Sequence, residues 1–180
     1  MNITVYLGAN TGHDAIWAEA VRELGNWIGS SSHQLIYGGS KAGLMGELAQ
    51  SVLDSGGRVI GVEPQFFIDA YLQLEGIDEL IVVPDMSTRK AKMMQLGDAF
   101  IAFPGGTGTL EEISEIMSAV CIGLTDKPCI IYNLNHYYDH LKALLDHMLE
   151  EGFIRPSAFE RIHFVSGLEQ IRQLLSSETP

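Results

Sequence analysis

The sequence predicts one α/β domain over residues 1–180, with a doubly wound parallel sheet and helices on both faces. Three observations predict this fold. Short, mostly apolar runs recur without polar alternation, which is typical of strands that are covered on both faces. Segments with apolar residues at helical spacing separate nearly all of these runs. Finally, regular alternation of strand and helix along one chain favours a parallel sheet.

Seven short apolar runs are the predicted strands. The first run is rich in β-branched side chains and ends at Gly8, and Pro84 terminates the fourth. In chain order the predicted strands are residues 3–7, 34–37, 58–62, 79–83, 99–103, 128–134 and 161–165.

Helices are predicted between the strands. In the first of them, apolar residues recur from Ile16 to Ile28 at intervals of three or four. In chain order the predicted helices are residues 14–28, 44–53, 65–75, 88–96, 109–124, 137–150 and 168–175. The helix at 65–75 is expected to be irregular, and the polar tail at 176–180 to be frayed.

The chain is acidic, with 11 Lys and Arg against 23 Asp and Glu and a formal net charge of −12. Nucleic acids and anionic membranes reward clustered cations, so neither is an expected partner. The N-terminus lacks the pattern of a secretory signal, and no apolar run approaches the about 20 residues of a membrane span. We therefore expect a cytoplasmic protein that binds a small molecule.

Glycines gather where the predicted strands end, at Gly8, at Gly38-Gly39 and at 105–108. In an open α/β sheet, ligands bind at the carboxyl ends of the strands. Tight turns also favour glycine, and for Gly8 alone a turn is sufficient explanation. The glycine density of 105–108 exceeds what one turn needs, so this loop is predicted to contact a ligand.

Two standard phosphate motifs are absent from that loop. No lysine follows Gly108 as a P-loop requires, and a GxGxxG pattern starting at Gly106 has Glu111 at its third glycine. The start of the following helix still presents backbone N–H groups and the positive end of a dipole. With hydroxyls from Thr107 and Thr109, this cradle suits a single phosphomonoester.

Arg89 and Lys90 lie near the start of the predicted helix 88–96. Cations are unfavourable at that end of a helix, by about 0.3–1 kcal/mol each. One explanation is an anion that both residues hold from the opposite wall of the crevice. The other is a solvated face, paired with Asp85. Both interpretations remain open at this point.

Glu111 and Glu112 fall in the first turn of the predicted helix 109–124. Capping of the dipole explains one glutamate, whereas two beside a glycine cradle favour a ligand role for at least one. We expect the dipole to keep both ionised. Ser118 lies seven residues from Glu111 and is a candidate to line the same pocket. A ribose 5-phosphate unit needs both features, because its anomeric carbon becomes cationic when a base leaves.

These residues resemble those of the LONELY GUY (LOG) family of cytokinin riboside 5′-monophosphate phosphoribohydrolases. The matching segments are 37–46, 88–93 and 98–112, and the pattern PGGxGTxxE is complete from Pro104 to Glu112. The resemblance covers roughly residues 1–165. It implies a Rossmann-like fold, a homodimer, and hydrolysis of AMP or its N6-modified forms to free base and ribose 5-phosphate, a step in cytokinin biosynthesis.

The resemblance also implies roles for individual residues. Arg89 and Glu112 would be essential to catalysis. Substrate contacts are expected from Lys90, from the second glycine cluster and from the loop and helix start after Pro104, namely Gly39, Gly105, Gly106, Thr107, Gly108, Thr109 and Glu111. No metal and no organic cofactor is expected. Relatives are often labelled lysine decarboxylases, but no lysine here has the context of a Schiff base.

The chain departs from the family pattern in three places. Ser40 stands where many relatives have a third glycine, and Ala9-Asn10 replace small hydroxyl residues. The second change weakens the case for a phosphate contact from that loop. The stretch 63–76 is unlike the usual family segment and is expected to shape the base pocket.

Two other classes of function compete with the hydrolase. One is a protein that binds a nucleotide or phosphorylated cofactor without turning it over, since related folds serve as molybdenum-cofactor carriers. The pair of Arg89 and Glu112 favours the hydrolase, because a carrier needs no carboxylate at the anomeric carbon. The other is an interaction protein whose apolar helix 109–124 pairs with its own copy across a two-fold axis, which is compatible with the hydrolase.

Overall fold

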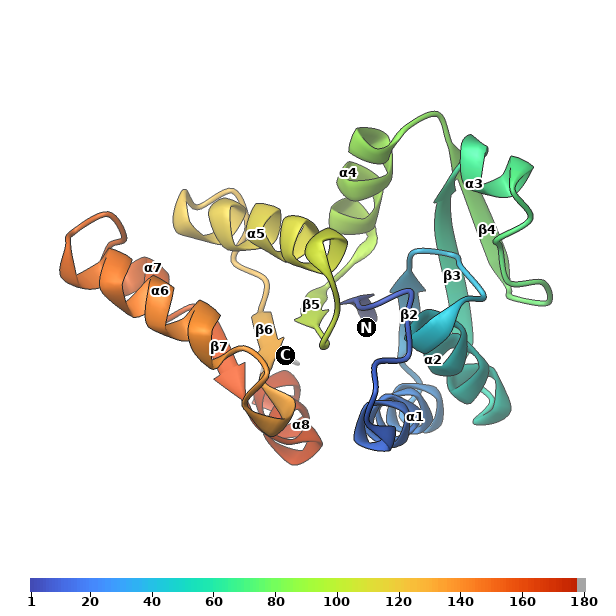
Figure 1. Cartoon of the computed structure of the whole chain (residues 1–180), viewed down its shortest axis with the longest axis horizontal. Helices are drawn as coiled ribbons and strands as arrows, with labels where there is room; N and C mark the ends of the chain where they lie inside the picture. The colour runs from blue at the N-terminus through green and yellow to red at the C-terminus, as the bar shows by residue number, and fades with distance from the viewer. Residues whose placement is uncertain (178–180) are drawn as a thin grey trace.

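Seven parallel strands form one sheet in the computed structural model, which describes residues 1–177. The strand order is β4-β3-β2-β1-β5-β6-β7 (Figure 1). Every predicted strand is present, with ends shifted by a residue or two. The strands are β1 (Asn2–Tyr6), β2 (Gln34–Tyr37), β3 (Arg58–Pro64), β4 (Glu79–Val83), β5 (Ala99–Ala102), β6 (Cys129–Tyr132) and β7 (Ile162–Val165).

Helices cover both faces of the sheet (Figure 1). One face packs against α1 (Ala15–Ser30), α2 (Gly43–Asp54) and α8 (Leu168–Ser177). The opposite face packs against α4 (Met86–Leu96), α5 (Thr107–Cys121), α6 (Asp139–Glu150) and the short α7 (Pro156–Phe159). Two further short elements are α3 (Gln65–Asp69) and η1 (Leu134–His136). The predicted doubly wound fold is confirmed.

The strands lack polar alternation because both of their faces are buried. In β1, Ile3 and Val5 enter the core beneath α1 and α2, whereas Tyr6 enters the core beneath α4 and α5. Thr4 also faces the second core, where its hydroxyl donates to the carbonyl of Met93 at 3.2 Å. The apolar runs therefore reflect two separate hydrophobic layers.

The sheet changes winding direction between β1 and β5. The chain runs outward from β1 to β4 and then returns through α4 to β5, on the other side of β1. The loops that follow β1 and β5 therefore leave the sheet in different directions, and a crevice opens between them. The two loops begin in contact, since the Phe103 amide donates to the Tyr6 carbonyl at 2.9 Å.

The segment predicted as an irregular helix is helical only over α3. Tyr71 takes a positive φ of 57°, and residues 72–74 then run alongside the loop after β2. Lys41 donates its amide to the Leu72 carbonyl, and Leu74 donates to the Gly39 carbonyl, each at 2.8 Å. Pairing with the glycine loop thus replaces the later turns of the predicted helix.

Three other boundaries differ from the prediction. Helix α4 begins at Met86 because Asp85 caps it, with the carboxylate accepting the Thr88 amide at 2.7 Å. Helix α5 begins at Thr107 and ends at Cys121. The predicted frayed tail is partly helical, since α8 extends through residue 177, and residues 178–180 lie outside the described part.

Within residues 1–177 no helix has both the length and the apolar character needed to cross a bilayer.

Helices α1 and α2 pack closely because α1 carries glycine at the contact. A Cβ on Gly25 would lie 2.7 Å from the Ser51 Cβ and 2.8 Å from the Leu48 carbonyl oxygen. We expect Gly25→Ala to lower the free energy of unfolding by about 1–3 kcal/mol through overpacking. This loss opposes the gain of about 1 kcal/mol that alanine brings to a helix interior.

Chemical denaturation would measure the difference. The control is Gly167→Ala, because a Cβ on Gly167 meets nothing within 4 Å. A Gly25→Ala variant that is more stable than the wild type would contradict the close packing of these two helices.

Candidate active site

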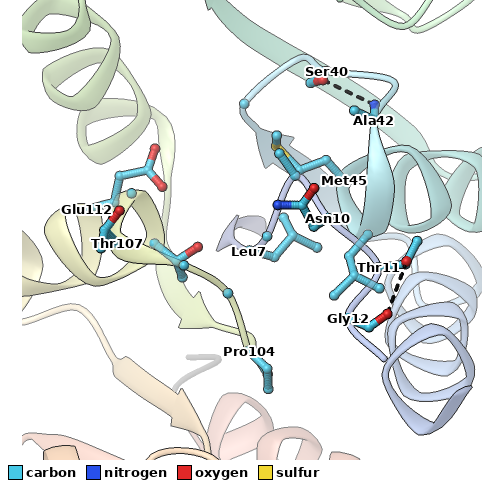
Figure 2. Close-up of a pocket in the computed structure, with 18 of the residues that line it drawn as sticks. Leu7, Asn10, Thr11, Gly12, Ser40, Ala42, Met45, Pro104, Thr107 and Glu112 are labelled. Carbon is cyan, nitrogen blue, oxygen red and sulfur yellow. Dashed lines mark hydrogen bonds between the residues drawn. The ribbon is translucent and has the colours of Figure 1, made fainter. Parts of the chain in front are cut away.

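A cavity of about 560 Å³ opens at the carboxyl ends of the central strands (Figure 2). The loops after β1, β2 and β5 line it, so the three glycine clusters of the sequence border one site. The start of α5, residues of the stretch 63–76 and Tyr137 also line it. Its size is within the range of small-molecule sites.

The start of α5 presents bare backbone to this cavity. Gly106 is the N-cap residue, and no side chain caps the helix. Because the first N–H groups of a helix have no partner within it, those of α5 are available to an anion. A Cβ on Gly106 or Gly108 would meet nothing within 4 Å, so packing does not explain these two glycines. Gly105 differs, because a Cβ there would collide with Thr109 and with the Gly8 amide.

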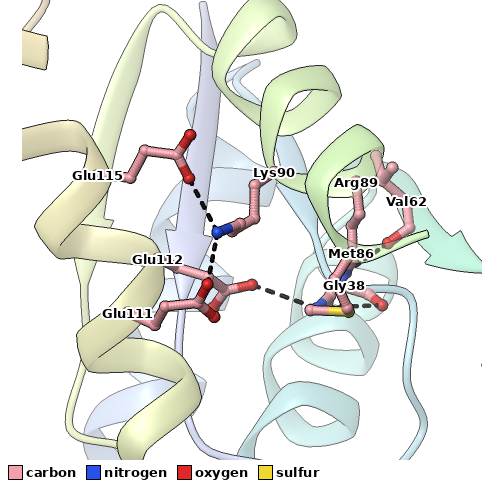
Figure 3. A network of polar contacts seen from close by, with 8 residues as sticks. All are labelled: Gly38, Val62, Met86, Arg89, Lys90, Glu111, Glu112 and Glu115. Carbon is pink, nitrogen blue, oxygen red and sulfur yellow. Dashed lines mark hydrogen bonds and ion pairs between the residues drawn. The ribbon is translucent and has the colours of Figure 1, made fainter.

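Arg89 enters the cavity from the first turn of α4 and is anchored by two carbonyls (Figure 3). Its Nε donates to the Val62 carbonyl at 2.9 Å, and its Nη2 donates to the Gly38 carbonyl at 3.1 Å. A Cβ on Gly38 would lie 1.8 Å from Nη2, so this position must be glycine for the arginine to fit. The guanidinium is therefore fixed across the ends of β2 and β3.

Glu112 faces Arg89 from the second turn of α5 (Figure 3). Its Oε1 lies 3.2 Å from Arg89 Nη1, and both side chains are buried. The approach is an ion pair without hydrogen-bond geometry, so Oε1 has no hydrogen-bond partner among residues 1–177. Burial raises the pKa of Glu112, and the charge of Arg89 opposes this rise. Burial thus acts against the ionised form that is expected of Glu112, and the charge of Arg89 favours that form.

Lys90 and Glu111 lie outside the cavity lining, on the side of the helices away from it. Lys90 Nζ forms ion pairs with Glu111 and, at 3.2 Å, with Glu115 (Figure 3). Consecutive helical residues point about 100° apart, so only one member of each pair can enter the site. Arg89 and Glu112 enter it, and their chain neighbours join α4 to α5 on the outside.

Two other residues of the sequence prediction also lie outside the lining. Ser118 is exposed on α5, two turns beyond Glu111, and shares the outward direction of that residue. Gly39 adopts a φ of 84° beside the cavity, and a Cβ there would lie 2.9 Å from Glu63 Oε2. The remaining predicted residues, namely Gly105, Gly106, Thr107, Gly108 and Thr109, line the cavity together with Arg89 and Glu112.

Trp17, Tyr137 and Glu63 are among the lining residues that sequence reasoning missed. Trp17 and Tyr137 contact each other edge to face, with ring centroids 5.7 Å apart, and the Tyr137 hydroxyl donates to the Gly105 carbonyl at 2.6 Å. No motif marked either aromatic residue. Glu63 did carry a signal, because it is the one acid in the apolar strand RVIGVEP. It is 1% exposed and lines the cavity beside Arg89.

Comparison with known proteins gives three informative matches. Residues 45–175 match a protein family described as possible lysine decarboxylase. A cytokinin riboside 5′-monophosphate phosphoribohydrolase of Rhodococcoides fascians is 43% identical over 93% of this chain and 85% of its own length. The enzyme of this name from Arabidopsis thaliana called LOG3 is 39% identical over 99% of this chain and 83% of its own length.

Among solved structures, the molybdenum cofactor binding protein of Rippkaea orientalis matches with a TM-score of 0.73. It is 22% identical and covers 98% of this chain and 95% of its own, which shows a shared fold. The sequence identity to phosphoribohydrolases over nearly the whole chain is what assigns the family. The chain belongs to the LOG family of cytokinin riboside 5′-monophosphate phosphoribohydrolases.

Proposed function

We propose that this protein hydrolyses the N-glycosidic bond of adenosine-type 5′-monophosphates, including N6-modified cytokinin precursors. The products are free base and ribose 5-phosphate. The observation that carries the proposal is the buried pair of Arg89 and Glu112, which lines the cavity one turn beyond the bare start of α5. Relatives that are 37–43% identical and are named for this activity support it.

The phosphate of the substrate binds at the start of α5. The charged side chains that line the cavity are Glu63, Arg89 and Glu112, two acids against one base. Side-chain charge alone therefore gives no net attraction for a phosphate. The backbone N–H groups after Gly106 and the dipole of α5 supply the attraction instead, as at other helix starts. The hydroxyls of Thr107 and Thr109 add further donors.

Glu112 then acts at the anomeric carbon of the ribose. It lies one helical turn from Gly108, about 5.4 Å along the helix axis. As the base departs, positive charge develops on the sugar, and a carboxylate stabilises that charge strongly in a site shielded from water. The Glu112 carboxylate also accepts a hydrogen bond from a ribose hydroxyl or from the attacking water. Arg89 holds this carboxylate in place.

A carrier without turnover is the alternative, and no observation in the site favours it. The likeness to molybdenum-cofactor proteins is at 20–22% identity and shows the fold only. Tight binding of intact nucleotide with no release of base would support the carrier and contradict the hydrolase.

We further propose a homodimer, on a narrower surface than the sequence indicates. Most apolar residues of α5, among them Ile113, Ile116 and Val120, pack into the protein's own core and cannot pair with a second copy. Ile122 and Leu124, just after α5, are 71% and 74% exposed and remain available. Light scattering at micromolar concentration tests this, and a monomer would contradict it. The cytoplasmic location stays a prediction.

Replacing the proposed carboxylate tests the assignment of Glu112. We expect Glu112→Gln to lower kcat for release of ribose 5-phosphate from AMP or isopentenyl-AMP by about 10²–10³-fold, the usual effect of one electrostatic group. The matched control is Glu115→Gln, also on α5 but outside the cavity. Full activity of Glu112→Gln would refute the role of this residue.

Arg89→Lys keeps the charge but loses the forked contacts to Val62 and Gly38. Because the carboxylate then lacks a fixed partner, we expect kcat/KM to fall by about 10²-fold or more, as for other misplaced catalytic groups. Lys92→Arg, on the outer side of the same helix, is the control. An Arg89→Lys enzyme with unchanged kcat/KM would show that charge without geometry suffices.

A further inference from the structure

Glu63 is a carboxyl buried at the end of β3, in the same cavity as Arg89 and Glu112. It is 1% exposed, and its Oε2 has no hydrogen-bond partner within residues 1–177. A carboxyl buried without a partner lowers the stability of a fold, so its presence requires an explanation. The described part of the chain offers none, whereas a ligand in the cavity does.

The loop after β2 is shaped to admit this carboxyl. A Cβ on Gly39 would lie 2.9 Å from Glu63 Oε2, and the positive φ of 84° at Gly39 turns the backbone around it. The Gly39 carbonyl is held in turn by the Leu74 amide at 2.8 Å. Glu63 is therefore confined in one place, as a group that meets a ligand should be.

The two cavity acids lie in different environments. Glu112 is in contact with the permanent charge of Arg89, which opposes the rise in its pKa that burial causes. Within residues 1–177 Glu63 has no ion-pair partner. Burial raises its pKa to about 7, against a smaller opposing effect of Arg89. The titratable groups that face it are Tyr37 from β2, Arg89 from α4 and Glu112 across the cavity. Burial and Glu63 both raise the pKa of Tyr37. Two acids in such contrasting surroundings suit an acid role and an anionic role.

We propose that Glu63 is the general acid that protonates the base as it leaves. The inference rests on the proposed hydrolase function. With the phosphate at the start of α5 and the anomeric carbon beside Glu112, the base extends away from α5 toward Glu63. The apolar part of the lining there suits a purine ring and consists of Met45, Phe67, Leu72 and Met86.

The step balances in atoms and charge. The bond between C1′ and the base nitrogen breaks, and its electron pair goes to the base. The proton of the Glu63 carboxyl moves to a ring nitrogen, so the base leaves neutral. Water adds through its oxygen to C1′, and its proton passes to Glu112 and then to solvent. Glu63 regains a proton from solvent, which leaves free base and ribose 5-phosphate as the only products.

A substrate whose leaving group needs no proton separates this role from a structural one. We expect Glu63→Gln to lower kcat for AMP or isopentenyl-AMP by about 10²–10⁴-fold, the usual contribution of a general acid. With 4-nitrophenyl ribofuranoside 5-phosphate, which releases a stable nitrophenolate, the loss should stay below about 10-fold, since that acid contribution is no longer needed. Glu112→Gln should slow both substrates, and Glu115→Gln neither.

Other outcomes overturn the proposal. An equal loss on both substrates would show that Glu63 only supports the structure, and a change confined to KM would make it a binding group. Unchanged kcat on the nucleotides would remove it from the reaction. If the wild-type enzyme released ribose 5-phosphate from no nucleotide, the hydrolase function itself would fail, which is a separate result from an active enzyme that tolerates Glu63→Gln.

The pH dependence gives a second measurement. Below about pH 7 Glu63 keeps its proton, so wild-type kcat should fall as pH rises through that value, and Glu63→Gln should lack this fall.

The stability of the fold should also depend on the protonation of Glu63. Its pKa is higher in the folded state than in the unfolded chain, so its contribution is present at pH 4 and lost as pH rises through about 7. The melting temperature of the wild type should therefore drop relative to Glu63→Gln between pH 5 and pH 8, and parallel curves would contradict the proposal.

Discussion

The site depends on one buried guanidinium. Arg89 donates to carbonyls at the ends of two neighbouring strands and faces Glu112 at 3.2 Å, so it joins α4, the sheet and α5 at a single point. A buried charge is costly unless it is paired and hydrogen-bonded, and Arg89 meets both conditions. It therefore fixes the position of the carboxylate.

The geometry of consecutive helical residues explains the two layers of charge around this point. Arg89 and Glu112 face inward, and Lys90 and Glu111 face outward, because neighbours on a helix cannot point the same way. The inner pair serves the cavity, and the outer pair holds α4 against α5 (Figure 3). One ion pair supports the other, since both fix the separation of the same two helices.

Much of the fold and part of the site could be predicted from the sequence. The apolar runs identified all seven strands, because a sheet covered on both faces keeps most side chains of its strands apolar. The start of α4 was missed because the capping bond of Asp85 is local geometry that apolar spacing does not register. The short extent of α3 was missed for a different reason. Its continuation pairs with a loop that is distant in the sequence, and periodicity contains no information on such contacts.

The glycines show the same limit. Their positions in the sequence indicated where the cavity lies, but not why each of these positions is a glycine. Gly38 and Gly39 leave room for the side chains of Arg89 and Glu63, whereas Gly106 and Gly108 leave open space before the backbone. A sequence shows that a small residue is present and not what occupies the space beside it. Glu63 was missed for this reason, since its pairing with Gly39 exists only in three dimensions.

Hydrogen bonds hold residues 72–74 against the loop after β2. The wall proposed to contact the base and the part proposed to bind the phosphate therefore belong to different segments of one pocket. The stretch 63–76 forms one wall, and the helix start at the opposite end belongs to a different strand and a different loop. Substitutions after Glu63 in that stretch can reshape the wall without moving the residues that bind the sugar phosphate. Otherwise similar enzymes can therefore prefer different bases while the residues that break the glycosidic bond stay the same.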